Sequence, residues 1–248
     1  MTHGTAAKGQ TAIRVAQVHK SFGRKHVLRD ITLTVESGEI FGLLGPSGSG
    51  KTTLVKLIAG LDDATSGEVE VAGVRMPSLG MLSKIGYMAQ SDALYTELTA
   101  KENLAFFASL YGLSGVQRAK RMAEVMELVN LSDAMNGVVS AYSGGMKRRL
   151  SLAIALLHQP GILILDEPTV GIDPVLRKAV WDELKRMSEA GTTILVTTHV
   201  MDEAEKCHRL GLIRNGVVMA VGTPEQLKQD TGAGSVEEAF LVYGGGEQ

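Results

Sequence analysis

The stretch Gly45-Pro46-Ser47-Gly48-Ser49-Gly50-Lys51-Thr52 limits the possible folds of this chain more than any other feature. It matches the pattern G-x-x-x-x-G-K-[ST], in which backbone N–H groups surround the phosphates of a nucleotide. Residues 39–44 read as a buried apolar strand, and residues 51–59 carry apolar side chains at helical spacing. The loop is therefore expected between a strand and a helix, with the positive end of the helix facing an anion. The sequence predicts an ATP or GTP site in an α/β fold.

The composition argues against several classes of function. The 248 residues suffice for one large domain or for a core with an inserted subdomain. The formal net charge is -2, so no overall positive field indicates nucleic acid as a partner. We interpret the basic cluster Lys147-Arg148-Arg149 as a solvated helix face. The single Cys207 has no cysteine to pair with, which fits a reducing cytosol.

The sequence has no apolar run near the roughly 18 to 20 residues that cross a bilayer. Residues 1–11 also lack the apolar centre of a signal peptide. We therefore expect this chain to be soluble, or to reach a membrane only through a partner. Residues 1–11 are small and polar and residues 244–248 are rich in glycine, so we expect a disordered tail at each end.

Strand patterns occur on both sides of the phosphate loop. Residues 12–18 and 27–35 alternate like two strands joined by a turn at 21–25, which predicts a sheet before the loop. Short apolar runs typical of buried strands follow at residues 68–71, 85–89, 162–165, 193–196 and 210–213. Together these patterns predict a mixed α/β core.

Helical spacing replaces the strand patterns between residues 94 and 159. Within it we expect Leu104, Phe107 and Leu110 to share an inward helical face. The predicted organisation is a tail at 1–11, an ATP-binding α/β core at 12–93 and 160–222, an inserted helical subdomain at 94–159, and a C-terminal helical segment and tail at 223–248.

Two adjacent carboxylates, Asp166 and Glu167, follow the apolar run at 162–165. Ligands of open α/β sheets bind at the carboxyl ends of strands. A magnesium ion bound to ATP needs oxygen ligands, which Thr52 and Asp166 can supply. Glu167 is then free to accept a proton from an attacking water or to orient it. A solvated strand end accounts for one acid more easily than two, so we favour a catalytic site.

The run Tyr142-Ser143-Gly144-Gly145-Met146 precedes a helix with apolar side chains at helical spacing. Its two glycines leave backbone N–H groups accessible, Ser143 adds a hydroxyl, and the helix dipole favours a phosphate oxygen. The run therefore looks like a second anion site. Taken alone, Ser-Gly-Gly also fits a turn ending in a helix N-cap.

The phosphate loop, Ser143-Gly144-Gly145 and Leu165-Asp166-Glu167-Pro168 together resemble the nucleotide-binding subunit of an ABC transporter, over about residues 12 to 242. The resemblance implies ATP as the nucleotide and a P-loop NTPase RecA-like core, with an N-terminal antiparallel β subdomain and an inserted α-helical subdomain. It also implies a head-to-tail dimer, either a homodimer or a heterodimer, that encloses two ATP molecules. Ser143 and Gly145 would then bind the γ-phosphate held by Lys51 of the partner subunit.

Four further residues match positions of this family. Phe22, in the expected turn between the first strands, matches the aromatic that stacks on adenine, with a buried core phenylalanine as the alternative. Gln90 matches the glutamine that senses magnesium and the γ-phosphate. His199 matches the histidine that contacts the γ-phosphate. Asp173 matches the aspartate of the loop linking the two active sites, with an N-cap for the helix opening at Pro174 as the alternative.

The implied site is larger than any one motif. The implied nucleotide-binding residues are Phe22, Gly45, Pro46, Ser47, Gly48, Ser49, Gly50, Lys51, Thr52, Thr53, Ser143, Gly144, Gly145 and Asp173. The implied catalytic residues are Glu167, His199 and Gln90, and the implied magnesium ligands are Thr52, Gln90 and Asp166.

The chain departs from the family's commonest motif, Leu-Ser-Gly-Gly-Gln, at Tyr142 and Met146, so we expect no contact from that glutamine. This variant, residues 98–113 and the ending at 236–241 look like the exporter branch, which moves drugs, lipids or polysaccharides. The resemblance implies separate transmembrane permease subunits, a peripheral location on the cytoplasmic face of the membrane, and no nucleic acid. Leu94, Tyr95 and Tyr111 are expected to line a groove for a permease helix.

Two other classes of function stay open. A soluble ABC-type ATPase with a non-transport role usually has two motor domains or a long coiled coil, and neither pattern is present in these residues. A phosphotransferase would share only the phosphate loop, and Glu167 beside Asp166 argues for attack by water instead.

Overall fold

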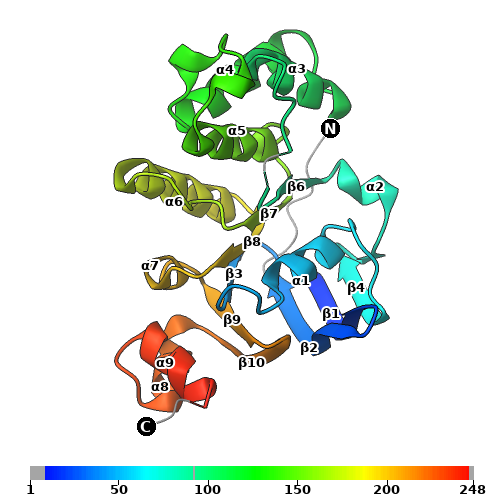
Figure 1. Cartoon of the computed structure of the whole chain (residues 1–248), viewed down its shortest axis with the longest axis vertical. Coiled ribbons are helices and arrows are strands. Elements are labelled where there is room, and N and C mark those ends of the chain that lie inside the picture. Colours follow the sequence, from blue (N-terminus) through cyan, green and yellow to red (C-terminus); the bar gives the residue numbers. More distant parts are fainter. Residues whose placement is uncertain (1–8, 92, 246–248) are drawn as a thin grey trace.

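The computed structural model describes residues 9–91 and 93–245, so our expectations for residues 1–8 and 246–248 lie outside the described part of the chain. A layer of helices lies at the top of Figure 1, the sheets lie below it, and a helical pair lies at the bottom. The upper layer contains α3 (Ala100–Leu110), α4 (Gly115–Leu128) and α5 (Gly144–Leu156), and the lower pair is α8 (Pro224–Thr231) and α9 (Val236–Tyr243).

The first sheet is a four-stranded antiparallel sheet in the order β2-β1-β4-β5. Its strands are β1 (Thr11–Phe22), β2 (Lys25–Glu36), β4 (Ser66–Val71) and β5 (Val74–Arg75). Phe22 pairs with Lys25, so the expected turn is confirmed but is shorter than 21–25, and Phe22 ends a strand instead of lying in the turn. Gly23, at φ 57°, provides the backbone conformation that a two-residue hairpin turn favours.

The expected N-terminal tail ends earlier than predicted. Thr11 begins β1, and the carbonyl of Gln10 accepts a hydrogen bond from the N–H of Ser37. The prediction of disorder is therefore wrong for these two residues, because pairing with the chain that follows β2 ties them to the sheet.

The second sheet has six strands in the order β10-β9-β3-β8-β7-β6. These are β3 (Ile40–Leu44), β6 (Ile85–Met88), β7 (Ile162–Asp166), β8 (Thr193–Thr198), β9 (Arg209–Arg214) and β10 (Val217–Gly222). All neighbours are parallel except β9 and β10. The carboxyl ends of β3, β7 and β8 therefore meet at one edge of the sheet, where Leu44 pairs with Thr198 and Asp166 pairs with Thr197.

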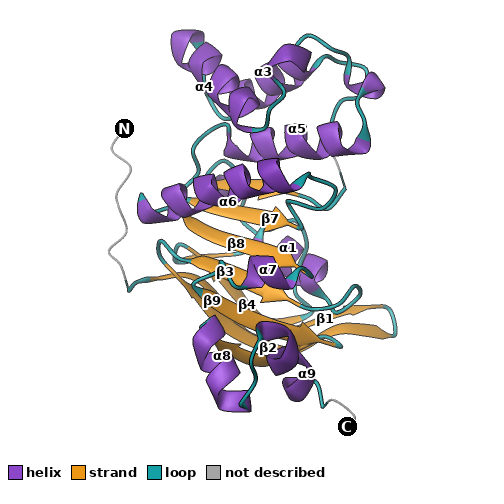
Figure 2. Ribbon diagram, turned by 90° about the vertical axis from the view of Figure 1, so that its left-hand side faces the viewer, coloured by secondary structure: helices purple, strands orange, loops and turns teal. Residues whose placement is uncertain are grey.

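Helices cover both faces of this second sheet. Helix α1 (Lys51–Ile58) contributes Leu54 and Ile58 to a core shared by the two sheets, alongside Phe41 of β3 and Ile13 of β1. On the other face, α5 and α6 (Pro174–Glu189) share a second core with the helical layer. Figure 2 shows α6 lying along the sheet, with α5 above it and then α3 and α4.

Shorter elements complete the described chain. They are α2 (Leu79–Leu82), α7 (Met201–Ala204) and the 3-10 turns at Ser132–Ala134 and Val139–Ala141. None of the helices formed by the described residues combines the length and the hydropathy needed to cross a bilayer.

The inward face of α3 differs from the one expected. Leu104 is fully buried and Phe107 is half-buried, but Leu110 is 63% exposed. The buried positions of α3 include Ala100, Leu104 and Ala108, and a residue two positions beyond Ala108 lies about 200° around the helix. The expectation for Leu110 is therefore wrong, because it ends the helix on the solvent side.

Candidate active site

The phosphate loop joins the end of β3 to the start of α1, as the pattern requires. A Cβ on Gly45 would lie 2.1 Å from the carbonyl oxygen of Ile213, so no side chain fits there. Gly50 has φ 106°, and a Cβ on it would lie 2.7 Å from Leu28 Cδ2. Residues 46–48 are exposed. The loop is thus packed tightly against the protein on one side and presents its backbone to solvent on the other.

Lys51 lies inside this loop and is only 5% exposed. Its Nζ donates to the carbonyl oxygens of Gly45, at 2.7 Å, and Pro46, at 3.1 Å, and lies 3.9 Å from Glu167 Oε1. Burial lowers the pKa of Lys51, while the carboxylates of Glu167 and Asp166 act in the opposite direction. The ammonium is therefore held where the loop would bring phosphate oxygens.

Asp166, at the end of β7, is fully buried. Its Oδ1 accepts a hydrogen bond of 2.5 Å from the hydroxyl of Thr197 in the neighbouring strand β8. Its Oδ2 is buried and has no hydrogen-bond partner among the described residues. Buried carboxylate oxygens seldom lack a partner, so this oxygen fits the prediction that Asp166 ligates a cation.

Glu167 leaves the strand in a left-handed conformation, at φ 52°. Its N–H donates to the carbonyl oxygen and the hydroxyl of Thr197, at 3.2 and 3.0 Å. Its Oε1 lies 3.1 Å from Nδ1 of His199, which follows β8. Non-glycine residues rarely adopt this conformation and are concentrated at functional sites. The structure thus brings Lys51, Glu167 and His199 together at one edge of the sheet.

These motifs and their geometry agree with a comparison of the chain with known protein families. Residues 28–170 match the family described as ABC transporter. The chain belongs to this family. As a member of the ABC transporter family it is an ATP-binding subunit, and it binds and hydrolyses ATP.

Relatives within the family carry export or resistance names. The chain is 39% identical to the linearmycin resistance ATP-binding protein of Bacillus subtilis, over 93% of this chain and 78% of that protein. It is 42% identical to the Nod factor export ATP-binding protein I of Rhizobium meliloti, over 96% and 71%. It is 40% identical to a probable multidrug ABC transporter ATP-binding protein of Escherichia coli, over 94% of this chain but only 42% of that protein.

Solved structures of the family share the fold. An ATP-binding subunit of an ABC transporter superposes with a TM-score of 0.88 at 29% identity, covering 94% of this chain and all of that one. A dimeric post-hydrolysis ATP-binding cassette bound to ADP and Pi superposes with a TM-score of 0.79, also at 29% identity, covering 85% and 98%. The expected P-loop NTPase core is therefore confirmed.

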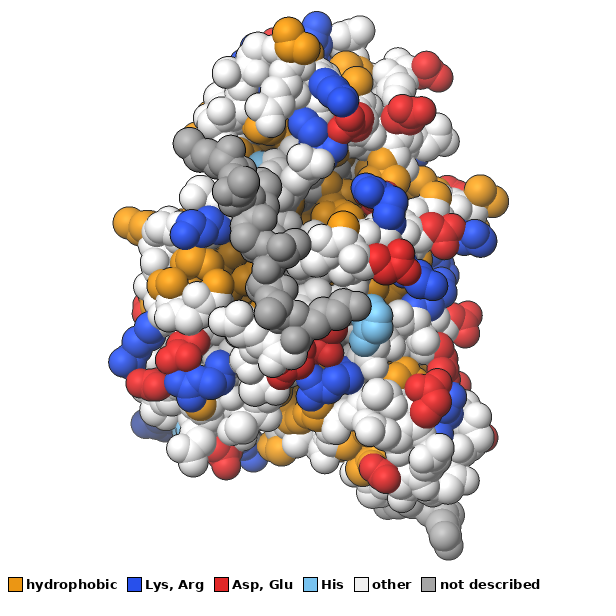
Figure 3. Space-filling view, turned by 180° about the vertical axis from the view of Figure 1, so that it is seen from behind, with side chains coloured by type: hydrophobic (Ala, Val, Ile, Leu, Met, Phe, Trp, Pro, Cys, Tyr) orange, Lys and Arg blue, Asp and Glu red, His pale blue; other side chains and the backbone are white. Residues whose placement is uncertain are grey.

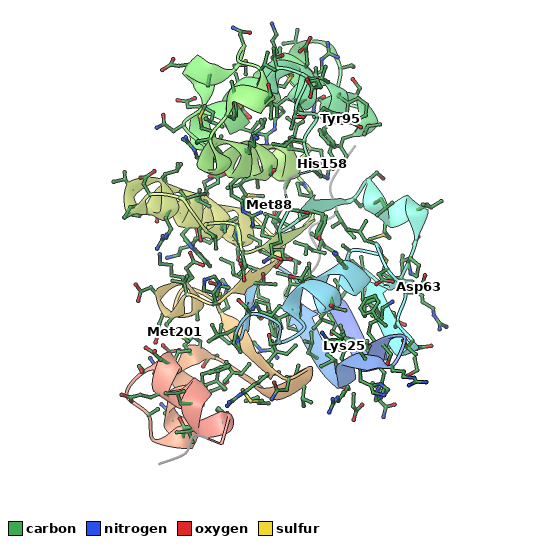
Figure 4. All side chains as sticks on the ribbon, viewed as in Figure 1. Lys25, Asp63, Met88, Tyr95, His158 and Met201 are labelled. Carbon is green, nitrogen blue, oxygen red and sulfur yellow. The ribbon has the colours of Figure 1, made fainter. Side chains whose placement is uncertain are left out.

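Gln90 lies just after β6 and is exposed. Figure 4 labels Met88, the last residue of β6, at the level where the helical layer meets the sheet. The backbone carbonyl of Gln90, and not its side chain, has a described contact, which is a hydrogen bond of 2.8 Å from Arg148. Arg148 also bonds to the carbonyl of Glu167, so it links Gln90 to the edge of the sheet that carries the proposed catalytic residues, which we call the catalytic edge.

That residue, Arg148 of α5, corrects the interpretation of Lys147-Arg148-Arg149 as a solvated helix face. Arg148 is 8% exposed, and Arg149 is half-buried and donates to the carbonyls of Val129 and Asn130. Helical spacing gave a signal that we overlooked, since Arg148 shares a face with the buried Leu152 and Ala155. A positive charge on a buried face needs partners, and here backbone carbonyls supply them.

Ser143 is the N-cap of α5, because its Oγ accepts from the N–H of Met146 at 3.2 Å. A Cβ on Gly144 would meet nothing within 4 Å, and one on Gly145 would lie 3.1 Å from the carbonyl oxygen of Gly171. The turn is therefore capped as the simpler alternative required, and Gly144 is open to a ligand. In Figure 1, α5 belongs to the helical layer, whereas α1, which follows the phosphate loop, lies among the sheets.

Tyr142 and Met146, the two departures from the family's commonest motif, face the protein. Tyr142 is buried and its hydroxyl donates to the carbonyl of Ala134 at 2.6 Å, and Met146 packs partly buried against the core. In this ABC subunit the variant side chains therefore anchor the turn to the helical layer.

Two of the predicted positions, Phe22 and Asp173, are exposed at the surface. Phe22 is 53% exposed, with Nζ of Lys20 at 4.8 Å from its ring centroid, so the alternative of a core phenylalanine is wrong. Asp173 is exposed and caps α6 by accepting from the N–H of Leu176 at 3.0 Å. The N-cap alternative for Asp173 is thus confirmed, while its role across an ABC dimer stays a prediction.

Proposed function

We propose that this chain pairs head to tail with a second copy or a related subunit, encloses two ATP molecules, and powers a separate transmembrane permease. One observation supports this most directly. The phosphate loop leads into α1 among the sheets, whereas the open, glycine-rich start of α5 belongs to the helical layer. Two chains in opposite orientation would supply both halves of each site, and a related solved cassette is a dimer.

The proposed chemistry assigns a role to each residue at the catalytic edge. The loop N–H groups and Lys51 neutralise phosphate charge, and Glu167 Oε1 takes the proton of the attacking water. His199, 3.1 Å from that oxygen, holds the carboxylate in place. Thr52 and Asp166 Oδ2, with Gln90, would hold a magnesium ion, which supplies positive charge to the phosphate oxygens.

We propose export as the direction, on the strength of the relatives' names. The permease would hold the subunit on the cytoplasmic face of the membrane. No nucleic acid is proposed, since the net charge is -2 and Figure 3 shows acidic and basic side chains interspersed over the described residues of one face. Within the chain, residues 12–93 and 160–222 would form the ATP-binding unit, 94–159 the helical unit and 223–248 the C-terminal segment.

The substitution Glu167→Gln tests the proposed base. The amide keeps the shape of the side chain but cannot accept the proton, so phosphate release should fall by about 10² to 10⁴-fold. ATP affinity should be retained, and size-exclusion chromatography with ATP should show a trapped dimer. Wild-type phosphate release by this variant would rule out Glu167 as the base.

The substitution Ser143→Arg tests the dimer. A bulky cation at the start of α5 should block the partner's ATP, so this variant should bind ATP as a monomer but not hydrolyse it. Lys51→Ala should also be inactive. A mixture of the two contains mixed dimers with one intact site, so it should regain up to half of the wild-type activity. Normal hydrolysis by Ser143→Arg alone would contradict the head-to-tail arrangement.

A further inference from the structure

Arg148, in helix α5, forms hydrogen bonds with two segments of the ATP site, one after β6 and one at the end of β7. One terminal nitrogen, Nη1, donates to the carbonyl oxygens of Ala89 and Gln90, at 2.7 and 2.8 Å. The other, Nη2, donates to the carbonyl of Glu167, at 2.7 Å, and to that of Asp166. The side chain is 8% exposed and belongs to α5 in the helical layer. One guanidinium thus joins three parts of the chain: the loop that contains Ala89 and Gln90, which we call the glutamine loop, the end of β7, and the helical layer.

These bonds act on the backbone of Glu167, which is held in an uncommon conformation. Its N–H is bonded to Thr197 and its C=O to Arg148, so the peptide groups on both sides of its Cα are fixed. A left-handed residue other than glycine persists only where its surroundings enforce it. The direction of the Glu167 side chain, and therefore the place of Oε1, depends on this backbone.

We propose that Arg148 is a positioning residue that sets the catalytic carboxylate and the glutamine loop in one arrangement and links both to α5. This inference rests on the proposed role of Glu167 as the base. The fork of the guanidinium suits the task, because its two terminal nitrogens carry two protons each and reach four acceptors at once. Lysine offers three protons from a single point and cannot span both pairs of carbonyls.

The position of Arg148 along α5 adds a mechanical link. Ser143 caps the helix five residues before Arg148, about 7.5 Å along the helix axis. A force on the cap from the partner's ATP is therefore transmitted through a rigid helix to the two loops of the chain's own site. Arg148 makes the arrangement of Glu167 depend on whether the opposite site is filled.

The test replaces Arg148 by lysine and uses its neighbour as the control. In Arg148→Lys, kcat should fall by about 10-fold or more, while the Kd for a fluorescent ATP analogue stays within about threefold of wild type. Arg149→Lys removes the fork of an arginine bonded to Val129 and Asn130, within the helical layer. That control should keep kcat within about twofold, because its carbonyl partners lie outside the ATP site. Thermal unfolding of both variants checks that they fold.

A double-variant cycle separates positioning from a general structural role. If Arg148 acts through Glu167, then Arg148→Lys in the Glu167→Gln background should cause no further loss of single-turnover hydrolysis. Hydrogen exchange should accelerate at the amides of residues 89–91, Asp166 and Glu167 in Arg148→Lys but not in Arg149→Lys.

The outcomes distinguish the two proposals. An inactive Glu167→Gln with a fully active Arg148→Lys would overturn the role of Arg148 alone. The same holds if Arg148→Lys weakens ATP binding as much as turnover, or if its loss adds fully to that of Glu167→Gln. A fully active Glu167→Gln would overturn the proposed base, and the inference about Arg148 with it.

Discussion

The hydroxyl of Thr197 forms hydrogen bonds with both Asp166 and Glu167, for which we propose different roles. It donates to Asp166 Oδ1 at 2.5 Å and accepts from the N–H of Glu167 at 3.0 Å. The proposed metal ligand and the proposed base thus share one support in the adjacent strand. Because Thr197 is fully buried, water does not take the place of a lost hydroxyl, and its two partners would lose their hydrogen bonds.

Thr197→Val should therefore impair both stability and hydrolysis. Valine keeps the shape but strands a buried carboxylate oxygen and weakens the hold on the N–H of Glu167, at a cost of about 1 to 3 kcal/mol in the free energy of unfolding. We expect kcat to fall by about 10-fold or more, measured by phosphate release. Thr193→Val is the matched control, since Thr193 is buried in the same strand and accepts from Gly38. If kcat fell as much in Thr193→Val as in Thr197→Val, the claim that Thr197 supports hydrolysis through Asp166 and Glu167 would be contradicted.

Among single residues, those that form a motif could be predicted from the sequence, whereas those that hold a motif in place could not. Asp166 and Glu167 were predicted from two acids after an apolar run, and the structure places them beside Lys51. Thr197 belonged to no predicted motif, and Arg148 was assigned to solvent. Their partners are backbone groups or residues far away in the chain, and such contacts leave no local pattern.

Among the elements, the predicted strands of the second sheet at 85–89, 162–165, 193–196 and 210–213 were confirmed, because buried parallel strands are nearly uniform in hydrophobicity. Strand β10 was missed, since it lies at the edge of the sheet and is mostly only half-buried. Asn215 and Gly216, at φ 51° and 75°, form the turn before it, and Asn-Gly is a strong hairpin signal that we did not use.

Glu203 of α7 joins two loops that leave the catalytic edge. Its carboxylate is 2% exposed and accepts from the hydroxyls of Thr198, at 2.7 Å, and Thr169. These lie beside His199 and in the loop before Asp173. Glu203→Leu should cost about 2 kcal/mol or more in the free energy of unfolding, because two buried hydroxyls lose their acceptor. Glu203→Gln, with one acceptor left, should cost clearly less in urea unfolding, and equal costs would contradict this reading.

The ends of α3 and α5 meet through a stacked pair. The rings of Tyr111 and His158 lie 3.7 Å apart at 12°. Tyr111 is thus half-buried against a ring of its own chain, and its place in the expected groove stays a prediction. Leu94 also packs against the core, which leaves Tyr95 as the exposed member of that predicted set.

This pair predicts a pH dependence. Burial lowers the pKa of His158 to about 4, below its ordinary value, so the folded state holds the ring neutral. The contribution to stability is complete above about pH 6.5 and is lost as the pH falls towards 4, at up to about 1.4 kcal/mol per pH unit. His158→Phe keeps the stacking without titrating. In urea unfolding the variant should gain stability relative to wild type as the pH falls through this range, and a constant difference would exclude the effect.

On the scale of the whole molecule, an aromatic cluster marks the proposed contact with the permease. Tyr95 is 49% exposed and meets the ring of Phe106 at 4.9 Å, which in turn meets Phe107 at 5.3 Å. Figure 4 places Tyr95 at the outer side of the helical layer. The buried amide of Asn103 fixes the backbone of Tyr95 from below, at 2.9 Å to both its N–H and its C=O.

Tyr95→Asp should therefore weaken docking without changing the fold. Loss of an aromatic anchor typically costs about 2 kcal/mol or more of binding, so co-purification with a solubilised permease should drop while basal ATPase is retained. Leu241→Asp, on the similarly exposed α9 at the opposite end of Figure 1, is the control. Undiminished co-purification of Tyr95→Asp would place the permease contact elsewhere.

The acceptors of Arg148 are all main-chain oxygens, which every amino acid provides. These hydrogen bonds therefore do not depend on which side chains occupy those four positions. A chimera that keeps α5 with Arg148 and takes the sheet from a relative would find the same main-chain acceptors there. We therefore expect such a chimera to keep the link between α5 and the edge of the sheet that carries Glu167.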